Sequence, residues 1–219
     1  GESATRWFKE GVTHYLAVKT LYERGLFDFV DVRRQLAKSA FFYANNPAAQ
    51  GRRATRLDLH RLPYDRGLLL ALALDGALAR CTDGSRSIDS WLSTLLAEVD
   101  ESYGIEALRE TFFATAGPNC RPGQRVWSHH IDGNRPVEPE RLFAELGLHY
   151  LRASSLDETK VLPLKGDERI WRRLFSPPTR RAEAQADAGQ PTSSPHRTSI
   201  HERTHRRVLS DRLGARLPL

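Results

Sequence analysis

The sequence predicts a mostly helical fold, with a short strand or two near 149–164. Three observations carry this prediction. Large apolar residues recur at helical spacing over residues 4–24, and the same period returns over 29–44. The most apolar run, Gly67 to Leu74, has the length of a buried helix segment and is far shorter than the roughly 18–20 residues of a membrane span. We therefore expect a soluble, helical chain without a membrane partner.

Capping residues and breakers set the limits of the expected helices. Ser3 can cap the first helix and Gly25 can end it, and Asn46-Pro47 stops the second. The expected helices cover residues 4–24, 29–44, 64–80, 87–99, 105–116 and 138–146. The Arg-rich segment 47–62 has no apolar period, and Pro and Gly interrupt 117–136, so both are expected to be loops.

The C-terminal part of the chain changes character. Strands are expected at 149–153 and 161–164, and residues 154–176 form a short extension of the body. Apolar residues become sparse in 177–219, which is rich in Arg, Ser, Pro and His, so this tail is expected to be disordered.

Most of the net positive charge lies in that tail. It holds 8 Arg and 4 acidic residues and so carries +4 of the net charge of +6, which leaves the body nearly neutral. Nucleic-acid binding is an alternative for the tail. Because the tail has no Phe, Tyr or Trp on which a base could stack, a solvated tail without a nucleic-acid partner is the better interpretation.

Two further features of composition bear on the chain. Cys81 and Cys120 stand far apart with no CxxC pair, so two unpaired thiols are expected, with a disulfide as the alternative. The chain has no Met and begins Gly1-Glu2-Ser3. We expect it to start in the middle of a longer protein.

Glu10 is the first candidate site residue. It is followed by Gly11 and lies among aromatic residues on a largely apolar helix, where a buried carboxylate needs a cation, a metal ion or a proton. The alternative is that Glu10 faces solvent or pairs with Arg6 or His14, which lie one turn away.

Tyr64 is the second candidate. It stands in LPYDRG at the start of the most apolar expected helix, where a phenol can face a site and Gly67 permits close backbone approach. The alternative is a tyrosine of the core, with Arg66 in a surface ion pair.

Taken together, three segments resemble one family. WFKEGVTHYLAVKTLYERGLFD is similar to the W-[VF]-x-E-G-[FV]-T-x-Y-[YL] segment of the glycyl-aminopeptidase family (peptidase family M sixty-one) of gluzincin zinc metallopeptidases. LPYDRGLLLALALDGALARCTDGSRSIDS resembles its Y-[DT]-[RK]-G-x-L-x-A-L-x-L-D helix and the segment after it, and IDGNRPVEPERLFAELGLHY resembles a later segment. The three occur in the family's order and span residues 3–153.

The resemblance implies both a fold and a site. Residues 1–153 would be the helical C-terminal part of a thermolysin-like catalytic domain. Glu10 would be a Zn²⁺ ligand, Tyr64 would hydrogen-bond the oxyanion of the tetrahedral intermediate, and the substrate would be a peptide. Thr13, His14 and Tyr15 are candidates for support of the metal ligand.

The chain also departs from the family. The family's HExxH, which supplies two His ligands and the general base, precedes the Glu10 segment and is not found before it here, and the family's PDZ domain is not evident after Ala153. The Zn²⁺ ligation is therefore incomplete in this chain, which is expected to be inactive alone. The tail does contain HExxH at 201–205, but Arg-rich surroundings and a place after Glu10 indicate coincidence. The pair His129-His130 is interpreted as a surface or packing feature.

Two hypotheses follow for the function. The first is a part of an aminopeptidase-like zinc metallopeptidase. The alternative is a non-catalytic helical interaction module or pseudo-enzyme that keeps the fold without the chemistry.

Overall fold

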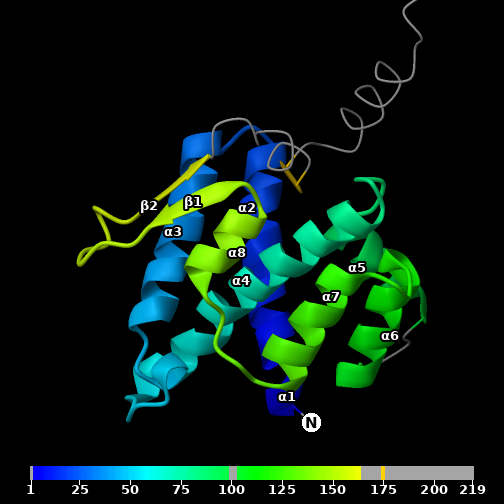
Figure 1. Ribbon diagram of the computed structural model, residues 1–219, viewed down its shortest axis with the longest axis horizontal. Coiled ribbons are helices and arrows are strands. Elements are labelled where there is room, and N and C mark those ends of the chain that lie inside the picture. The colour runs from blue at the N-terminus through cyan, green and yellow to red at the C-terminus, as the bar shows by residue number, and fades with distance from the viewer. Residues whose placement is uncertain (1, 99–102, 164–173, 176–219) are drawn as a thin grey trace, which may run out of the picture.

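The computed structural model describes residues 2–98, 103–163 and 174–175, and they form a mostly helical bundle with one two-stranded hairpin (Figure 1). The long helix α4, Arg56–Cys81, runs through the middle of the bundle. The segments that begin the chain and α3 lie on one side of α4, and α5, α6 and α7 lie on the other. The prediction of a mostly helical fold with a short strand or two is therefore confirmed.

The first expected helix is present but is not uniform. It consists of α1, Glu2–Trp7, a π-helical turn η1, Phe8–Val12, and α2, Thr13–Glu23. Trp7 and Val12 at the two junctions have right-handed helical backbone angles, so the three pieces form one continuous rod. A π turn inserts an extra residue into a helix and often occurs at a functional site. Here it contains Glu10.

The second helix, α3, spans Phe29–Asn45, close to its expected limits. Its start is fixed by a reciprocal cap: the Asp28 carboxylate accepts from the backbone N–H of Asp31, and the Asp31 carboxylate accepts from that of Asp28. The helix ends at Asn46 before Pro47, and a short 3₁₀ turn η2, Ala48–Gln50, follows.

The start of α4 differs from the expectation. The helix begins at Arg56, so the last part of the expected loop 47–62 is helical, and Pro63 lies inside the helix. The reason is a second reciprocal cap, in which Thr55 Oγ1 accepts from the N–H of Asp58 and the Asp58 carboxylate accepts from that of Thr55. Pro63 lacks an N–H and removes one bond from the helix without ending it.

The segments after α4 hold a second correction. The helices α5, Ile88–Glu98, and α6, Ile105–Ala116, are close to expectation. The segment 117–136, expected to be a loop, contains the short helix α7, Arg121–Arg125, which continues as a π-helical segment η3, Val126–Asp132. Pro122 stands in the first turn of α7, where its missing N–H costs nothing. Trp127 of η3 is buried in the core, and this burial stabilises the segment.

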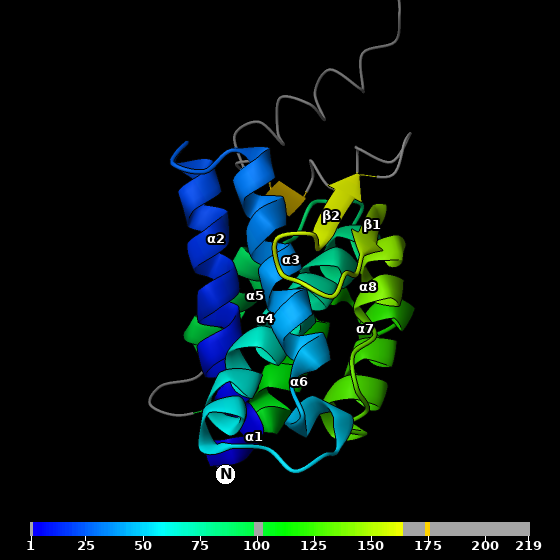
Figure 2. The ribbon, with the colours of Figure 1, turned by 90° about the vertical axis from the view of Figure 1, so that its left-hand side faces the viewer.

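The chain then forms α8, Pro139–Glu145, and the two expected strands. These are β1, Leu148–Leu151, and β2, Lys160–Pro163, which pair antiparallel with Tyr150 opposite Val161. Tyr150 and Val161 are buried, and β1 packs on α8 while β2 packs on α3. The hairpin thus covers one end of the bundle (Figure 2).

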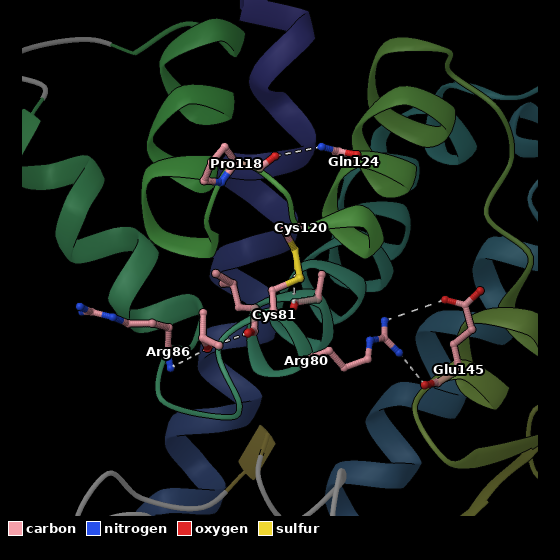
Figure 3. Close-up of a disulfide and its surroundings, with 10 residues drawn as sticks. Arg80, Cys81, Arg86, Pro118, Cys120, Gln124 and Glu145 are labelled. Carbon is pink, nitrogen blue, oxygen red and sulfur yellow. Dashed lines mark hydrogen bonds and ion pairs between the residues drawn. A yellow bond between two sulfur atoms is a disulfide. The ribbon is translucent and has the colours of Figure 1, made fainter.

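A disulfide joins Cys81, the last residue of α4, to Cys120, just before α7 (Figure 3). The two Cα atoms are 5.5 Å apart, which is ordinary disulfide spacing. The expectation of two unpaired thiols is therefore wrong. The disulfide could not be predicted from the spacing of the two cysteines along the chain, because their pairing depends on how α4 packs against the α6–α7 connection.

Among the residues that the structure describes, no helix is both long and apolar enough to cross a bilayer. The tail 177–219, which was expected to be disordered, lies outside the described residues. Of the segment just before it, Phe175 is buried and its ring packs edge-on against Tyr15 and Tyr22.

Candidate functional site

The candidate site begins at a close crossing between η1 and α4. A Cβ atom added to Gly11 would lie 2.1 Å from Gly67 Cα, and one added to Gly67 would lie 2.2 Å from the Trp7 carbonyl oxygen. Neither contact is possible for a real side chain, so the two backbones touch only because both residues are glycine. This crossing sets Glu10, next to Gly11, beside Tyr64, one turn before Gly67.

Glu10 and Tyr64 line the same pocket. It has a volume of about 490 Å³ and lies between the first helical rod, α3 and α4. Its lining residues are Glu10, Thr13, His14, Ala17, Gln35, Lys38, Ser39, His60, Arg61, Tyr64 and Asp65. The structure therefore brings the two sequence-predicted site residues together.

The phenol of Tyr64 responds to its neighbour. Hydrogen bonding with the Glu10 carboxylate raises the pKa of Tyr64 above its ordinary value, with burial and the negative charge of Glu10 acting in the same direction. The His60 ring stacks on Tyr64, with 5.8 Å between ring centroids. At pH 7 Tyr64 is, like an ordinary tyrosine, a neutral phenol that can donate a hydrogen bond.

Asp65 adds a buried carboxyl group to the pocket wall. It is only 4% exposed, and burial raises its pKa to about 6 against the partial compensation of Arg61 and Lys38. Arg61 Nε lies 3.5 Å from Asp65 Oδ2, an ion-pair distance, but this oxygen accepts no well-aligned hydrogen bond from the described residues. The group therefore changes charge near pH 6, which is unusual for an aspartate.

His14 is the second titratable group in the wall. Burial lowers its pKa below the ordinary value, and the charges of Lys38 and Arg61 lower it further. Its Nδ1 is buried and finds no hydrogen-bond partner among the described residues. His14 is thus held as a neutral imidazole at pH 7, with one ring nitrogen available.

The other flanking candidates have different places. Thr13 lines the pocket, but its hydroxyl donates to the Lys9 carbonyl one turn earlier in its own helix. Tyr15 lies in the core, where its hydroxyl donates to Asp75 at 2.7 Å. Tyr15 therefore does not lie at the pocket, and the support predicted for the metal ligand reduces to Thr13 and His14.

The residues fit a metal ion only in part. Glu10 offers a half-buried carboxylate that opens on a pocket, which suits one Zn²⁺ ligand. However, no group of three or more His, Cys, Asp or Glu residues that could hold a metal ion is present in 2–98, 103–163 and 174–175. The HExxH at 201–205 lies outside these residues. Further ligands would have to come from elsewhere.

Sequence reasoning missed some residues of the site. Asp65 and His60 were not singled out, and both lie on α4 with Tyr64. The Thr55–Asp58 cap was the available signal for His60, because it starts the helix early enough to place His60 one turn before Tyr64. No sequence signal indicated that Asp65 points inward, since an Asp beside an Arg four residues earlier usually forms a surface pair.

Neither the protein-family models nor the curated proteins with which the chain was compared give a match.

Proposed function

We propose that the chain is part of an aminopeptidase-like, zinc-dependent metallopeptidase that cleaves peptide bonds with a metal-activated water. The observation that carries the proposal is the meeting of Glu10 and Tyr64 in one pocket at the Gly11–Gly67 crossing. Resemblance to the gluzincins gives those two residues their roles, and the pocket gives them the necessary proximity.

The two residues would act as follows. Glu10 would hold the zinc ion as one of its three protein ligands. The ion would lower the pKa of its bound water and polarise the scissile carbonyl. Tyr64 would exchange its hydrogen bond to Glu10 for one to the developing oxyanion, which a neutral phenol can donate.

The remaining groups would come from an HExxH outside the described residues. In the proposed enzyme it precedes Glu10, and its glutamate deprotonates the attacking water. The described residues alone hold an incomplete ligand set, so we propose that the isolated chain of 219 residues is inactive.

The first experiment determines the coding sequence before the codon of Gly1. The proposal expects an apolar helix with HExxH about 20–40 residues before Glu10, the arrangement that the resemblance implies. A continuous reading frame without that motif would favour the alternative, a non-catalytic helical module.

The second experiment tests the two roles in the chain joined to that segment. Cleavage of aminoacyl p-nitroanilides is measured together with bound zinc. Tyr64→Phe should lower kcat by about 10²–10³ while zinc content stays complete, because only the oxyanion donor is lost. Glu10→Gln should lower zinc content, whereas Glu158→Gln, an exposed glutamate in the loop before β2, should change neither.

The tail motif needs its own control. In the isolated chain, His201→Ala should leave zinc affinity unchanged, since the proposal takes the HExxH at 201–205 to be coincidental. Tight 1:1 zinc binding that the substitution abolishes would instead make this motif a metal site.

A further inference from the structure

A second cavity lies on the other side of α4 and shares no lining residue with the pocket of Glu10 and Tyr64. It has a volume of about 340 Å³ and is enclosed by α4, α7, η3, the segment 133–138 and α8. We call it the arginine cavity, because its charged lining is formed by Arg80, Arg125, Arg135, Arg141, Glu138 and Glu145. It also contains His129 and His130, the pair interpreted from the sequence as a surface or packing feature.

The positive charges are only partly neutralised within the structure. Arg80 reaches from the end of α4 to Glu145 on α8, with 2.7 Å from Nη1 to the main-chain oxygen and 4.0 Å from Nη2 to the carboxylate (Figure 3). Arg141 lies 3.3 Å from the same carboxylate. The single carboxylate of Glu145 is therefore shared by two guanidinium groups, those of Arg80 and Arg141.

The other two arginines have no such partner in the part of the chain that the structure describes. Arg125 and Arg135 are exposed and form no ion pair with any residue that the structure describes. Arg80 Nε is buried and likewise finds no acceptor among those residues. Burial lowers the pKa of Arg80, and the charge of Arg125 lowers it further against the attraction of Glu145. An oxyanion in the cavity would relieve both the unpaired donor and this repulsion.

Part of the cavity lining is apolar. Leu70, Val137 and Leu142 are almost fully buried, and Ala73 and Val126 also belong to this apolar part. Small-molecule sites commonly combine such an apolar lining with a few convergent polar groups. A ligand for this cavity therefore needs an apolar body as well as negative charge.

We propose that the arginine cavity is a binding site for a phosphate monoester with a small apolar body. At pH 7 such a phosphate carries a charge of about −1.5 to −2, which matches the two guanidinium groups without an ion-pair partner. Arginine is well suited to the phosphate because its planar fork donates two parallel hydrogen bonds to phosphate oxygens. The site is independent of the proposed peptidase function.

Calorimetric titration of the full chain with phenyl phosphate tests the proposal. We expect 1:1 binding that weakens as NaCl is raised, because the attraction is between charges. Inorganic phosphate should bind more weakly, since it lacks the apolar body, and benzyl alcohol, which lacks the charge, should not bind measurably. Benzyl alcohol binding as tightly as phenyl phosphate, or absence of phenyl phosphate binding, overturns the proposal.

Variants locate the site. Arg125→Gln and Arg135→Gln should each weaken phenyl phosphate binding about tenfold, the usual cost of one charged hydrogen bond. Arg34→Gln is the matched control, because Arg34 is an exposed arginine of α3 whose ion pair, among the described residues, is with Asp31. Equal affinity in all three variants overturns the assignment to this cavity.

One variant tests the charge in the opposite direction. Glu138 lines the cavity and forms no ion pair with the described residues, so Glu138→Gln removes a repulsive charge without removing a structural contact. It should bind phenyl phosphate severalfold more tightly. Unchanged or weaker binding in a variant with an unaltered thermal midpoint counts against the site.

Discussion

Asp65 couples the stability of the protein to pH. Its pKa rises from an ordinary value of 3.8 to about 6 in the folded chain, so the folded state holds this proton more tightly than the unfolded state. The stabilisation that the Asp65 proton gives the folded state is therefore fully present below about pH 4. It is lost as the pH rises through about 6. The loss amounts to about 3 kcal/mol. Asp65→Asn should remove this decline.

The measurement is urea unfolding of wild type and Asp65→Asn from pH 3 to pH 7. Relative to wild type, the variant should gain about 3 kcal/mol in free energy of unfolding between the acid and neutral ends. Asp58→Asn serves as the opposite control. Hydrogen bonds from Thr55 lower the pKa of Asp58, so its stabilising effect is present at neutral pH and is lost as pH falls. A pH-independent difference for Asp65→Asn would contradict the burial assigned to it.

Lys19, on α2, is a second buried charge. It is 1% exposed and lies 3.6 Å from Asp75, itself fully buried, while it also bonds Asp89. Lys19→Met would leave Asp75 buried without its cation and should cost about 3–5 kcal/mol in free energy of unfolding. Lys9→Met, at an exposed lysine, should cost less than about 0.5 kcal/mol in the same denaturant titration.

At the scale of elements, helices with a regular apolar period are predicted from the sequence, whereas segments whose conformation depends on tertiary packing are not. The apolar period located α3 and the rod formed by α1, η1 and α2, and the Glu10-Gly11 pair and the LPYDRG segment singled out the two candidate residues. The π turn around Glu10 was not predictable, because it arises where the backbones of the rod and α4 meet. The segment 121–132 was missed because the prolines and glycines of 117–136 suggest a loop, while burial of Trp127 holds it helical.

The crossing of η1 and α4 gives a prediction at this scale. Gly67→Ala would place a Cβ atom 2.2 Å from the Trp7 carbonyl oxygen, so the two elements must separate. We expect a loss of about 3 kcal/mol in free energy of unfolding, the upper range for overpacking, and a displaced Glu10–Tyr64 pair. Gly104→Ala is the control, since a Cβ there meets nothing within 4 Å. Equal stability of the two variants, measured by urea titration, would contradict the close crossing.

At the scale of the whole molecule, α4 links two functional proposals that lie on its opposite sides. Its first half presents Tyr64 and Asp65 to the pocket with Glu10, and its second half presents Arg80 to the arginine cavity. Because both sites contain residues of α4, their positions depend on the contacts that hold the C-terminal end of this helix against its neighbours. The Cys81–Cys120 disulfide provides that fastening beside Arg80 (Figure 3).

The disulfide gives the last prediction. It closes a loop with a sequence separation of 39 residues, and loss of such a cross-link costs about 2–4 kcal/mol, chiefly by freeing the unfolded chain. Reduction of the disulfide in wild type should lower the urea midpoint of unfolding to the extent that this free-energy loss implies. The Cys81→Ser/Cys120→Ser variant should have the lowered midpoint without reductant, and reductant should not change it. Because Cys120 is buried against the end of α4, the same variant should also weaken phenyl phosphate binding at the neighbouring arginine cavity. A reductant-insensitive midpoint in wild type would show that the two cysteines are not paired in solution.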